Sequence, residues 1–298
     1  MKYKKEVKIY SFYRFKKIKN KKKFKFDLDI FLKNKNIRGT ILIASEGING
    51  TISGDSKDLK SIINLIKKIL NIRVLSLKIN VFDHHPFSRI KVRLKNEIVT
   101  LGLKDSILKI NNGKYVKPKD WDKLINSNEV KCIDTRNKYE ISIGKFSNSI
   151  NPGMKSFREF PEKFQKLEIN KNLKIAIYCT GGIRCEKASA YLKSQGYKKV
   201  YQLEGGILNY LDEQKLINKK DNWQGECFVF DKRVTVNKNL KQGKYLQCYG
   251  CRRPIPHKMV FSENYKKGVH CPYCYLERTK EQKRKSTDRQ KQIDKNLI

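Results

Sequence analysis

The chain contains eight cysteines, whose thiols can act as nucleophiles or metal ligands, and Cys179 has the most distinctive sequence surroundings among them. The apolar residues 173–178 before it favour a buried strand, and residues 186–195 after it favour a helix closed by Gly196. The thiol would then lie on a loop whose backbone N–H groups and helix dipole favour an anion. With Arg184 closing the loop, we predict a nucleophilic thiolate whose pKa lies well below the ~8.5 of a free cysteine.

Both cysteines of this stretch also have a structural interpretation. Cys179 could be a buried packing thiol, as most single cysteines are, but the adjacent Gly181 and Gly182 favour the reactive loop. Cys185 could be a resolving thiol that forms a disulfide with Cys179 during turnover. Because a position just inside a helix is often buried, we prefer a helix-packing thiol for Cys185 and keep it as a supporting residue of the site.

Four other cysteines have the spacing of a metal site. They form two C-x-x-C pairs separated by 19 residues, and they are Cys248, Cys251, Cys271 and Cys274. This spacing is typical of four-cysteine zinc sites, and a small segment with few apolar residues needs the metal to fold. We therefore predict a structural zinc ion, with His257 and His270 as possible substitute ligands; the alternative is a cluster that holds no metal.

The elements that come first in the chain alternate between strand and helix. The strand patterns cover residues 7–15, 38–45, 74–82 and 90–94, and the helix patterns cover residues 24–34 and a segment capped by Asp55 or Ser56. Turn-forming residues 47–50, followed by extended residues 51–53, indicate a hairpin. This order resembles a ferredoxin-like α/β sandwich. Residues 45–51 have a second interpretation, in which their polar groups face the thiol.

Three cations share one face of the last of these strands. Lys91, Arg93 and Lys95 alternate with apolar residues, so they point to the same side. The simpler interpretation is a solvated strand face. The functional one is a strip that binds the phosphates of RNA.

Before the thiol loop, a second strand ends in charged residues. Residues 130–133 favour a strand, and Asp134 and Arg136 follow at its end, where loops gather ligands. The two charges could simply pair with each other, but loops carry function more often than cores do, so we keep them as supporting residues of the site. Residues 157–161 are expected to pack a loop.

The thiol loop resembles the active-site loop of rhodanese domains. In that family the cysteine carries a persulfide and the arginine helps to hold its charge; the loop here consists of Cys179, Thr180, Gly181, Gly182, Ile183 and Arg184. Four residues separate Cys179 from Arg184, whereas the related cysteine phosphatases use five and form a wider cradle for phosphate. Residues 134–140 and 200–206 resemble the motifs that flank the rhodanese loop.

Three further blocks narrow the resemblance. Residues 45–51, 157–161 and 225–231 are similar to blocks of the rhodanese-related tRNA uridine hydroxylases, and together the blocks span nearly the whole chain. The resemblance implies oxygen-dependent 5-hydroxylation of the wobble uridine of tRNA, with Cys179 essential, molecular oxygen as co-substrate and the anticodon loop as partner. The residues alone leave two alternatives: a sulfurtransferase that carries sulfane sulfur on Cys179, and a non-catalytic RNA-binding module.

The resemblance also sets the expected organisation, an α/β protein with a small cysteine-rich segment after its second domain. We predict a ferredoxin-like domain at residues 1–100, a linker at 101–114, a rhodanese-type parallel-sheet domain at 115–215, a zinc-binding segment at 216–276, and a charged tail at 277–298. The tail has no apolar face and is expected to be a frayed helix or disordered.

Composition agrees with an RNA substrate without requiring one. The net charge is +38 in 298 residues, but Lys, Asn and Ile are abundant throughout, as an AT-rich genome would produce. Cysteine usage typical of a reducing compartment, a start without an apolar leader and the lack of a run of roughly 20 apolar residues predict a cytoplasmic protein outside the membrane. The chain has no glycine fingerprint for flavin or nicotinamide, no haem motif and no iron triad; the reductant stays unidentified.

Overall fold

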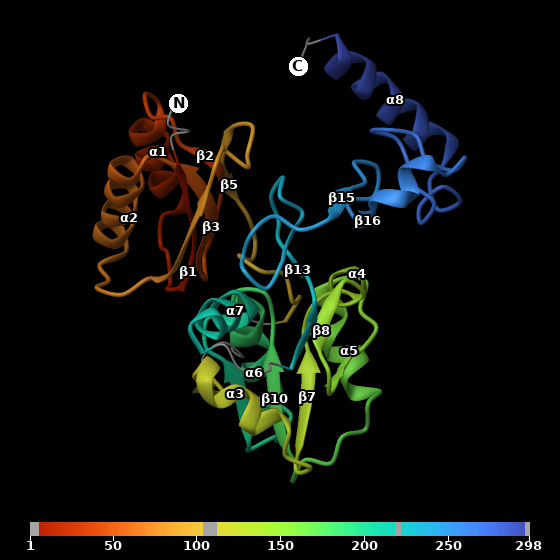
Figure 1. Ribbon diagram of the computed structural model, residues 1–298. Coiled ribbons are helices and arrows are strands. Elements are labelled where there is room, and N and C mark those ends of the chain that lie inside the picture. The colour runs from red at the N-terminus through yellow and green to blue at the C-terminus, as the bar shows by residue number, and fades with distance from the viewer. Residues whose placement is uncertain (1–5, 104–111, 218–221, 296–298) are drawn as a thin grey trace. The chain divides into compact units, whose positions relative to one another are not determined.

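The computed structural model describes residues 6–103, 112–217 and 222–295 (Figure 1). The chain forms two compact units, of which the first contains Met1–Lys138 and Ser147–Asn222, and the second contains Tyr139–Phe146 and Trp223–Ile298. Most of the predicted linker lies outside the described residues. The predicted domain boundaries therefore stay a prediction.

A five-stranded mixed sheet forms the N-terminal part of the first unit. Its strand order is β4-β1-β3-β2-β5, in which β5 runs parallel to β2 and the other neighbours are antiparallel. The first four strands and two helices give the predicted ferredoxin-like order, and β5 extends the sheet at one edge. The strands are β1 (Val7–Phe15), β2 (Arg38–Ala44), β3 (Gly47–Gly54), β4 (Ser76–Phe82) and β5 (Ile90–Leu94).

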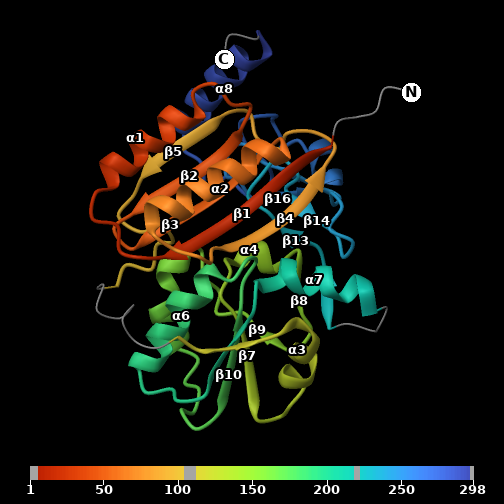
Figure 2. The same cartoon turned by 90° about the vertical axis from the view of Figure 1, so that its left-hand side faces the viewer.

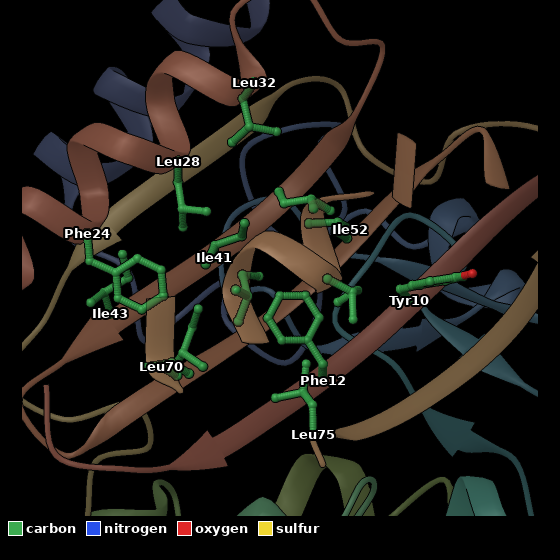
Figure 3. Close-up of a cluster of buried hydrophobic side chains, with 14 of the residues drawn as sticks. Tyr10, Phe12, Phe24, Leu28, Leu32, Ile41, Ile43, Ile52, Leu70 and Leu75 are labelled. Atoms are coloured by element: carbon green, nitrogen blue, oxygen red, sulfur yellow. The ribbon is translucent and has the colours of Figure 1, made fainter. Parts of the chain in front are cut away.

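Two helices cover one face of this sheet, α1 (Lys21–Leu32) and α2 (Ser56–Leu70) (Figure 2). Asp55 caps α2 by accepting a hydrogen bond from the Lys57 N–H, as expected, and Asn71 ends the helix in the left-handed conformation. The apolar stripe of each helix packs on the sheet, and Figure 3 shows Phe24 and Leu28 of α1 beside Ile41 and Ile43 of β2. α1 begins three residues earlier than predicted.

The hairpin between β2 and β3 turns earlier than expected. The turn lies at Ser45 and Glu46, and the prediction of a turn at residues 47–50 is wrong because β3 already begins at Gly47. Gly47 and Gly50 serve close packing instead of a turn. A Cβ on Gly50 would lie 2.7 Å from the ring of Phe12 on the neighbouring strand.

A parallel sheet forms the rest of the first unit. Its strand order is β6-β11-β10-β7-β9, and all neighbours are parallel, as in the predicted rhodanese-type domain. The register places Tyr178 beside Asp134, so the loops after β10 and β7 leave the same edge. The strands are β6 (Lys114–Val116), β7 (Val130–Asp134), β9 (Ser149–Ile150), β10 (Lys174–Tyr178) and β11 (Val200–Leu203).

Helices pack on both faces of the parallel sheet. On one face, Phe160 and Tyr191 share a buried cluster with Ile133 and Ile177. On the other, the Trp121 ring contacts the Tyr178 ring edge-on. Residues 157–161, expected to pack a loop, instead form η2 and the start of α5, and Phe157 and Phe160 lie in this buried cluster. The helices of this part are α3 (Pro118–Ile125), the 3₁₀ helix η2 (Phe157–Glu159), α5 (Phe160–Gln165), α6 (Ile183–Ser194) and α7 (Gly206–Ile217), and the short helix α4 (Lys138–Ile141) belongs almost entirely to the second unit.

The second unit consists mainly of short two-stranded antiparallel sheets and one long helix. Its strands pair antiparallel as β8 (Gly144–Phe146) with β12 (Trp223–Gly225), β13 (Cys227–Phe228) with β14 (Thr235–Val236), and β15 (Tyr245–Gln247) with β16 (Pro254–Pro256). They are followed by the 3₁₀ helix η3 (His257–Phe261) and by α8 (Lys280–Asp294).

The expectation of a frayed or disordered tail is wrong over residues 280–294. Thr279 forms a capping box with Gln282 at the start of α8. Arg278 donates to the Gly250 carbonyl at 2.7 Å, and Arg289 donates to the Gly268 carbonyl at 3.1 Å, so polar contacts hold the helix where an apolar face is missing. Among the residues in the described ranges, no helix combines the length and the apolar character needed to cross a bilayer.

Candidate functional site

Cys179 follows β10 directly, at the edge of the parallel sheet where β7 also ends. The loop turns at Gly182, whose φ of 92° is left-handed, and α6 begins at Ile183. The helix therefore starts three residues earlier than predicted. As a result, Arg184 and Cys185 lie in its first turn, where unpaired N–H groups and the dipole act on the loop.

The Cys179 sulfur is an acceptor surrounded by donors. The Gly182 N–H donates to it at 3.1 Å, and the side chain is only 1% exposed. Burial alone would raise the pKa of this thiol. A hydrogen bond from Cys185, the charge of Arg184 and the backbone N–H groups of Arg184 and Cys185 outweigh burial and lower the pKa of Cys179 to about 6. At neutral pH the sulfur is then a thiolate.

Cys185 has the opposite protonation state. Burial, together with the neighbouring Cys179 thiolate, raises the pKa of the Cys185 thiol well above its ordinary value. Its sulfur lies 3.8 Å from the Thr135 hydroxyl, which is 2.9 Å from the Tyr178 carbonyl. The pair therefore consists of one anionic sulfur and one neutral thiol that donates to it.

The two glycines of the loop have different neighbours. A Cβ on Gly182 would lie 3.0 Å from the phenol oxygen of Tyr13, whereas a Cβ on Gly181 would meet no described atom within 4 Å. The loop is thus closed at Gly182 and open at Gly181. Arg184 also lies across the loop, with Nη2 at 3.4 Å from the Thr180 hydroxyl.

Gly205 and Gly206, which follow β11, allow the start of α7 to pack against the Cys179 loop. The Ile207 N–H donates to the Cys179 carbonyl at 2.9 Å, and the Leu208 N–H donates to the Thr180 carbonyl at 3.1 Å. A Cβ on Gly206 would lie 2.7 Å from the Thr180 carbonyl oxygen, so only glycine permits this approach. The start of α7 therefore fixes the backbone that carries the thiol.

Asp134 and Arg136 pair with each other, which was the simpler of their two interpretations. Arg136 donates to both carboxylate oxygens, with Nε at 3.0 Å and Nη2 at 2.7 Å, and both side chains are fully buried. The Arg136 guanidinium also lies 5.7 Å from the centre of the Tyr178 ring. This pair stiffens the end of β7 next to β10.

Sequence reasoning missed a cluster around Glu186, in the first turn of α6. One carboxylate oxygen accepts from the Tyr13 phenol at 3.1 Å and from the Tyr115 phenol at 2.6 Å, and the other accepts from Asn112. Burial raises the pKa of Glu186, and burial followed by the Glu186 charge raises the pKa of Tyr13. No local pattern could link residues 13 and 186.

Residues 45–51 reach α6, one turn beyond the loop. Glu46 pairs with Lys187 at 2.8 Å and accepts from the Ile98 N–H at 2.7 Å, while Glu97 also pairs with Lys187 at 2.5 Å. Burial raises the pKa of Glu46. Asn49 donates to the Ile98 carbonyl at 3.1 Å. These contacts of Glu46 and Asn49 therefore go to α6 and to Ile98. The second interpretation of residues 45–51 expected their polar groups to face the Cys179 thiol.

Lys91 and Arg93 lie on β5 and Lys95 follows its last residue, and the three cations lie on the face opposite the helices. Ile90 and Val92 pack against the N-terminal core, so Lys91, Arg93 and Lys95 point the other way. Arg93 and Lys95 are exposed, and Lys91 is half-buried. Whether they contact RNA stays a prediction.

The four paired cysteines converge in the second unit, where their sulfurs all lie within 4.8 Å of one another. Three neighbouring sulfur pairs are separated by 3.9 Å. Tetrahedral bonds of about 2.3 Å to zinc place sulfurs about 3.8 Å apart, so Cys248, Cys251, Cys271 and Cys274 fit a metal ion. His270 instead approaches the Asn264 carbonyl, with Nδ1 at 2.9 Å.

Comparison with known proteins covers both halves of the first unit. Residues 7–98 match the UPF0176 acylphosphatase like domain, and residues 117–213 match the rhodanese-like domain. Among solved structures, a rhodanese-related protein from Thermoplasma volcanium is 26% identical over 34% of this chain and 92% of its own, with a TM-score of 0.28. A rhodanese-like domain protein from Staphylococcus aureus is 26% identical over 33% of this chain and 90% of its own, also with a TM-score of 0.28.

One curated relative matches nearly the whole length. The tRNA uridine(34) hydroxylase of Pelagibacter ubique is 48% identical over 288 residues, which are 96% of this chain and 94% of the relative. This match extends past the rhodanese-like segment through the cysteine cluster. The chain therefore belongs to the tRNA uridine(34) hydroxylase family.

Proposed function

We propose that this protein hydroxylates carbon 5 of the wobble uridine of tRNA in an oxygen-dependent reaction that requires Cys179. The observation that carries the proposal is the thiolate: a buried sulfur with a pKa of about 6, which accepts from the Gly182 N–H at 3.1 Å. Membership of the hydroxylase family supplies the substrate and the type of reaction. The enzyme is then an oxidoreductase.

The loop is suited to a base that has left its stack. A Cβ on Gly181 would meet no described atom within 4 Å, so the loop is open at this residue. We propose that the base approaches the loop there. The anticodon loop is unpaired, so the uridine can leave its stack there at a lower cost than in a duplex. We assign the anticodon loop as the segment that enters the site.

The reaction needs electrons from outside the uridine. One oxygen atom of O₂ enters the C5–H bond, and the other leaves as water after taking up two protons and two electrons from a reductant. What the chain contributes is a fixed thiolate, a neutral Cys185 thiol that donates to it, and a loop held by the start of α7.

Two further assignments follow from the charge and the cysteines. Lys91, Arg93 and Lys95 are proposed to contact tRNA phosphates, so binding should weaken steeply as salt rises. The cysteine cluster is proposed to hold one zinc ion, which organises the short hairpins of the second unit and takes no part in the chemistry. A cytoplasmic location is also proposed, supported by cysteine usage typical of a reducing compartment and by a tRNA substrate.

The test compares tRNA nucleosides from cells that carry the wild-type gene, Cys179→Ala or Cys132→Ala. Cys132 is the matched control, because it is a buried thiol in the adjacent strand β7 whose burial raises its pKa. We expect Cys179→Ala to abolish 5-hydroxyuridine, and Cys132→Ala to retain it. Growth without oxygen should have the same effect as Cys179→Ala.

Two results would overturn the proposal. Normal 5-hydroxyuridine in the Cys179→Ala strain would remove the thiolate from the reaction. Loss of a thiolated base, with 5-hydroxyuridine unchanged, would assign Cys179 to sulfur transfer through a persulfide instead.

A further inference from the structure

Both C-x-x-C turns of the second unit carry an exposed tyrosine. Tyr249, in the first turn, is 45% exposed, and Tyr273, in the second, is 46% exposed. They lie in a strongly basic segment, since residues 244–295 contain 14 Lys or Arg against 5 Asp or Glu. Exposed aromatic rings in a basic surface are the features that bind unpaired nucleotides, by stacking on bases and by attracting phosphates.

The first turn closes with an arginine in a strained backbone conformation. Arg252 has a φ of 65°, and its N–H donates to the Cys248 carbonyl at 2.7 Å to close the turn. Glycine adopts this conformation at no steric cost, whereas other residues are strained by about 1 kcal/mol or more. A function of the Arg252 side chain would explain why an arginine occupies the position.

Val234 shows one way in which such strain is compensated. Its φ is 64°, and its side chain is 5% exposed in a buried cluster with Ile143 and Phe228. Arg252 has no comparable burial, because its side chain is exposed. The guanidinium lies 5.3 Å from the centre of the Tyr249 ring, which gives a paired ring and cation at the surface.

The surroundings of this pair are also basic. Arg253 donates to the Tyr273 carbonyl at 3.2 Å and pairs with Glu277, which ties the second turn to the first. Lys283 of α8 lies 4.0 Å from the centre of the Tyr275 ring. With α8 held to the cluster by Arg278 and Arg289, its exposed cations are Lys280, Arg284, Lys285 and Lys291.

We infer that the cysteine cluster carries a second RNA-binding surface, in which Tyr249 stacks on an unpaired base and Arg252 binds the adjacent phosphate. RNA is favoured over an acidic protein segment because a ring paired with a guanidinium offers a stacking plane together with a charge. The inference rests on the proposed function for the identity of the RNA, a tRNA. It assigns the second unit to binding and leaves the chemistry with Cys179.

The test measures the Kd of full-length, zinc-loaded protein for unmodified tRNA. Arg252→Gly removes the side chain and relieves the backbone, so it should keep the fold and the metal. We expect its Kd for tRNA to rise about tenfold, equivalent to about 1.4 kcal/mol, and Tyr249→Ala to have an effect of the same size. Lys60→Ala is the matched control, because it removes one exposed cation from α2, and its Kd should stay within about twofold of the wild type.

An unchanged Kd in both Arg252→Gly and Tyr249→Ala would overturn the inference. The proposed function fails separately. If Cys179→Ala cells retain 5-hydroxyuridine, the activity is reassigned, while the tRNA affinities of the Arg252 and Tyr249 variants still decide the binding surface.

Discussion

Two regions of the molecule bury cysteine sulfurs, and the sulfurs have different neighbours in each. At the Cys179 loop, one sulfur accepts from a backbone N–H at 3.1 Å, and its neighbour Cys185 stays a neutral donor. In the second unit, four sulfurs lie within 4.8 Å of one another. Fixed donors can stabilise one thiolate, but four thiolates at such distances need a cation.

The comparison indicates that the groups around a thiol, more than its burial, determine its chemical role. Cys179 is 1% exposed and Cys271 is 0% exposed, so burial does not distinguish them. Cys179 has N–H groups and Arg184 around it, while Cys271 has three other sulfurs. The first arrangement favours a nucleophile, and the second fits a metal ligand.

The largest expected effect comes from breaking the four-sulfur arrangement. Cys271→Ser should lose the zinc and unfold the second unit, because structural zinc supplies about 10–16 kcal/mol to small domains. Metal content by mass spectrometry and protease resistance of residues 244–295 measure this. Cys227→Ser is the control, since Cys227 is buried in the same unit outside the cluster. Zinc at one per chain in a protease-resistant Cys271→Ser protein would contradict the account.

Both cysteine regions could be predicted from the sequence, because the spacing of their residues is a local pattern. C-x-x-C pairs, the glycines of the thiol loop and the double glycine at residues 205 and 206 are local patterns, and each corresponds to a geometry in the structure. The parallel order of β10 and β7 also follows from apolar runs that end in polar loops. Local patterns therefore identified the thiol loop and the cysteines that converge in the second unit.

What the sequence could not predict depends on distant contacts. Glu186 receives hydrogen bonds from residues that are 71 and 173 positions away, and Lys187 pairs with Glu46 and Glu97. The glycines at positions 47 and 50 resembled a turn because their close packing against β1 is a tertiary effect. The order of α8 was missed for a similar reason, because it depends on the distant carbonyls of Gly250 and Gly268, which accept from Arg278 and Arg289.

A second experiment tests how Cys185 affects the pKa of Cys179. Cys185→Ala removes a donor from the Cys179 thiolate, so the Cys179 pKa should rise by about 1–2 units, as expected for one lost hydrogen bond to a charged group. Cys185→Ser keeps a donor but cannot form a disulfide. We expect the serine variant to recover most of the lowered pKa and to retain 5-hydroxyuridine; a serine variant without hydroxylation would make Cys185 a resolving thiol.

A smaller effect is expected from the missed cluster. Tyr13→Phe removes one of the two phenols on the same Glu186 oxygen, so the free energy of unfolding should fall by about 1 kcal/mol. Chemical denaturation followed by circular dichroism measures the change. Tyr201→Phe, at a half-buried tyrosine on β11, is the control. Equal stabilities of the two variants would show that the Tyr13 contact contributes nothing.

The most direct test of the central claim is the pH dependence of alkylation at Cys179, followed by peptide mass analysis. Its surroundings predict a midpoint near pH 6, because Gly182, Cys185 and Arg184 favour the thiolate. Arg184→Ala should move the midpoint upward, since it removes the positive charge. A wild-type midpoint at or above the ~8.5 of a free cysteine would contradict the account.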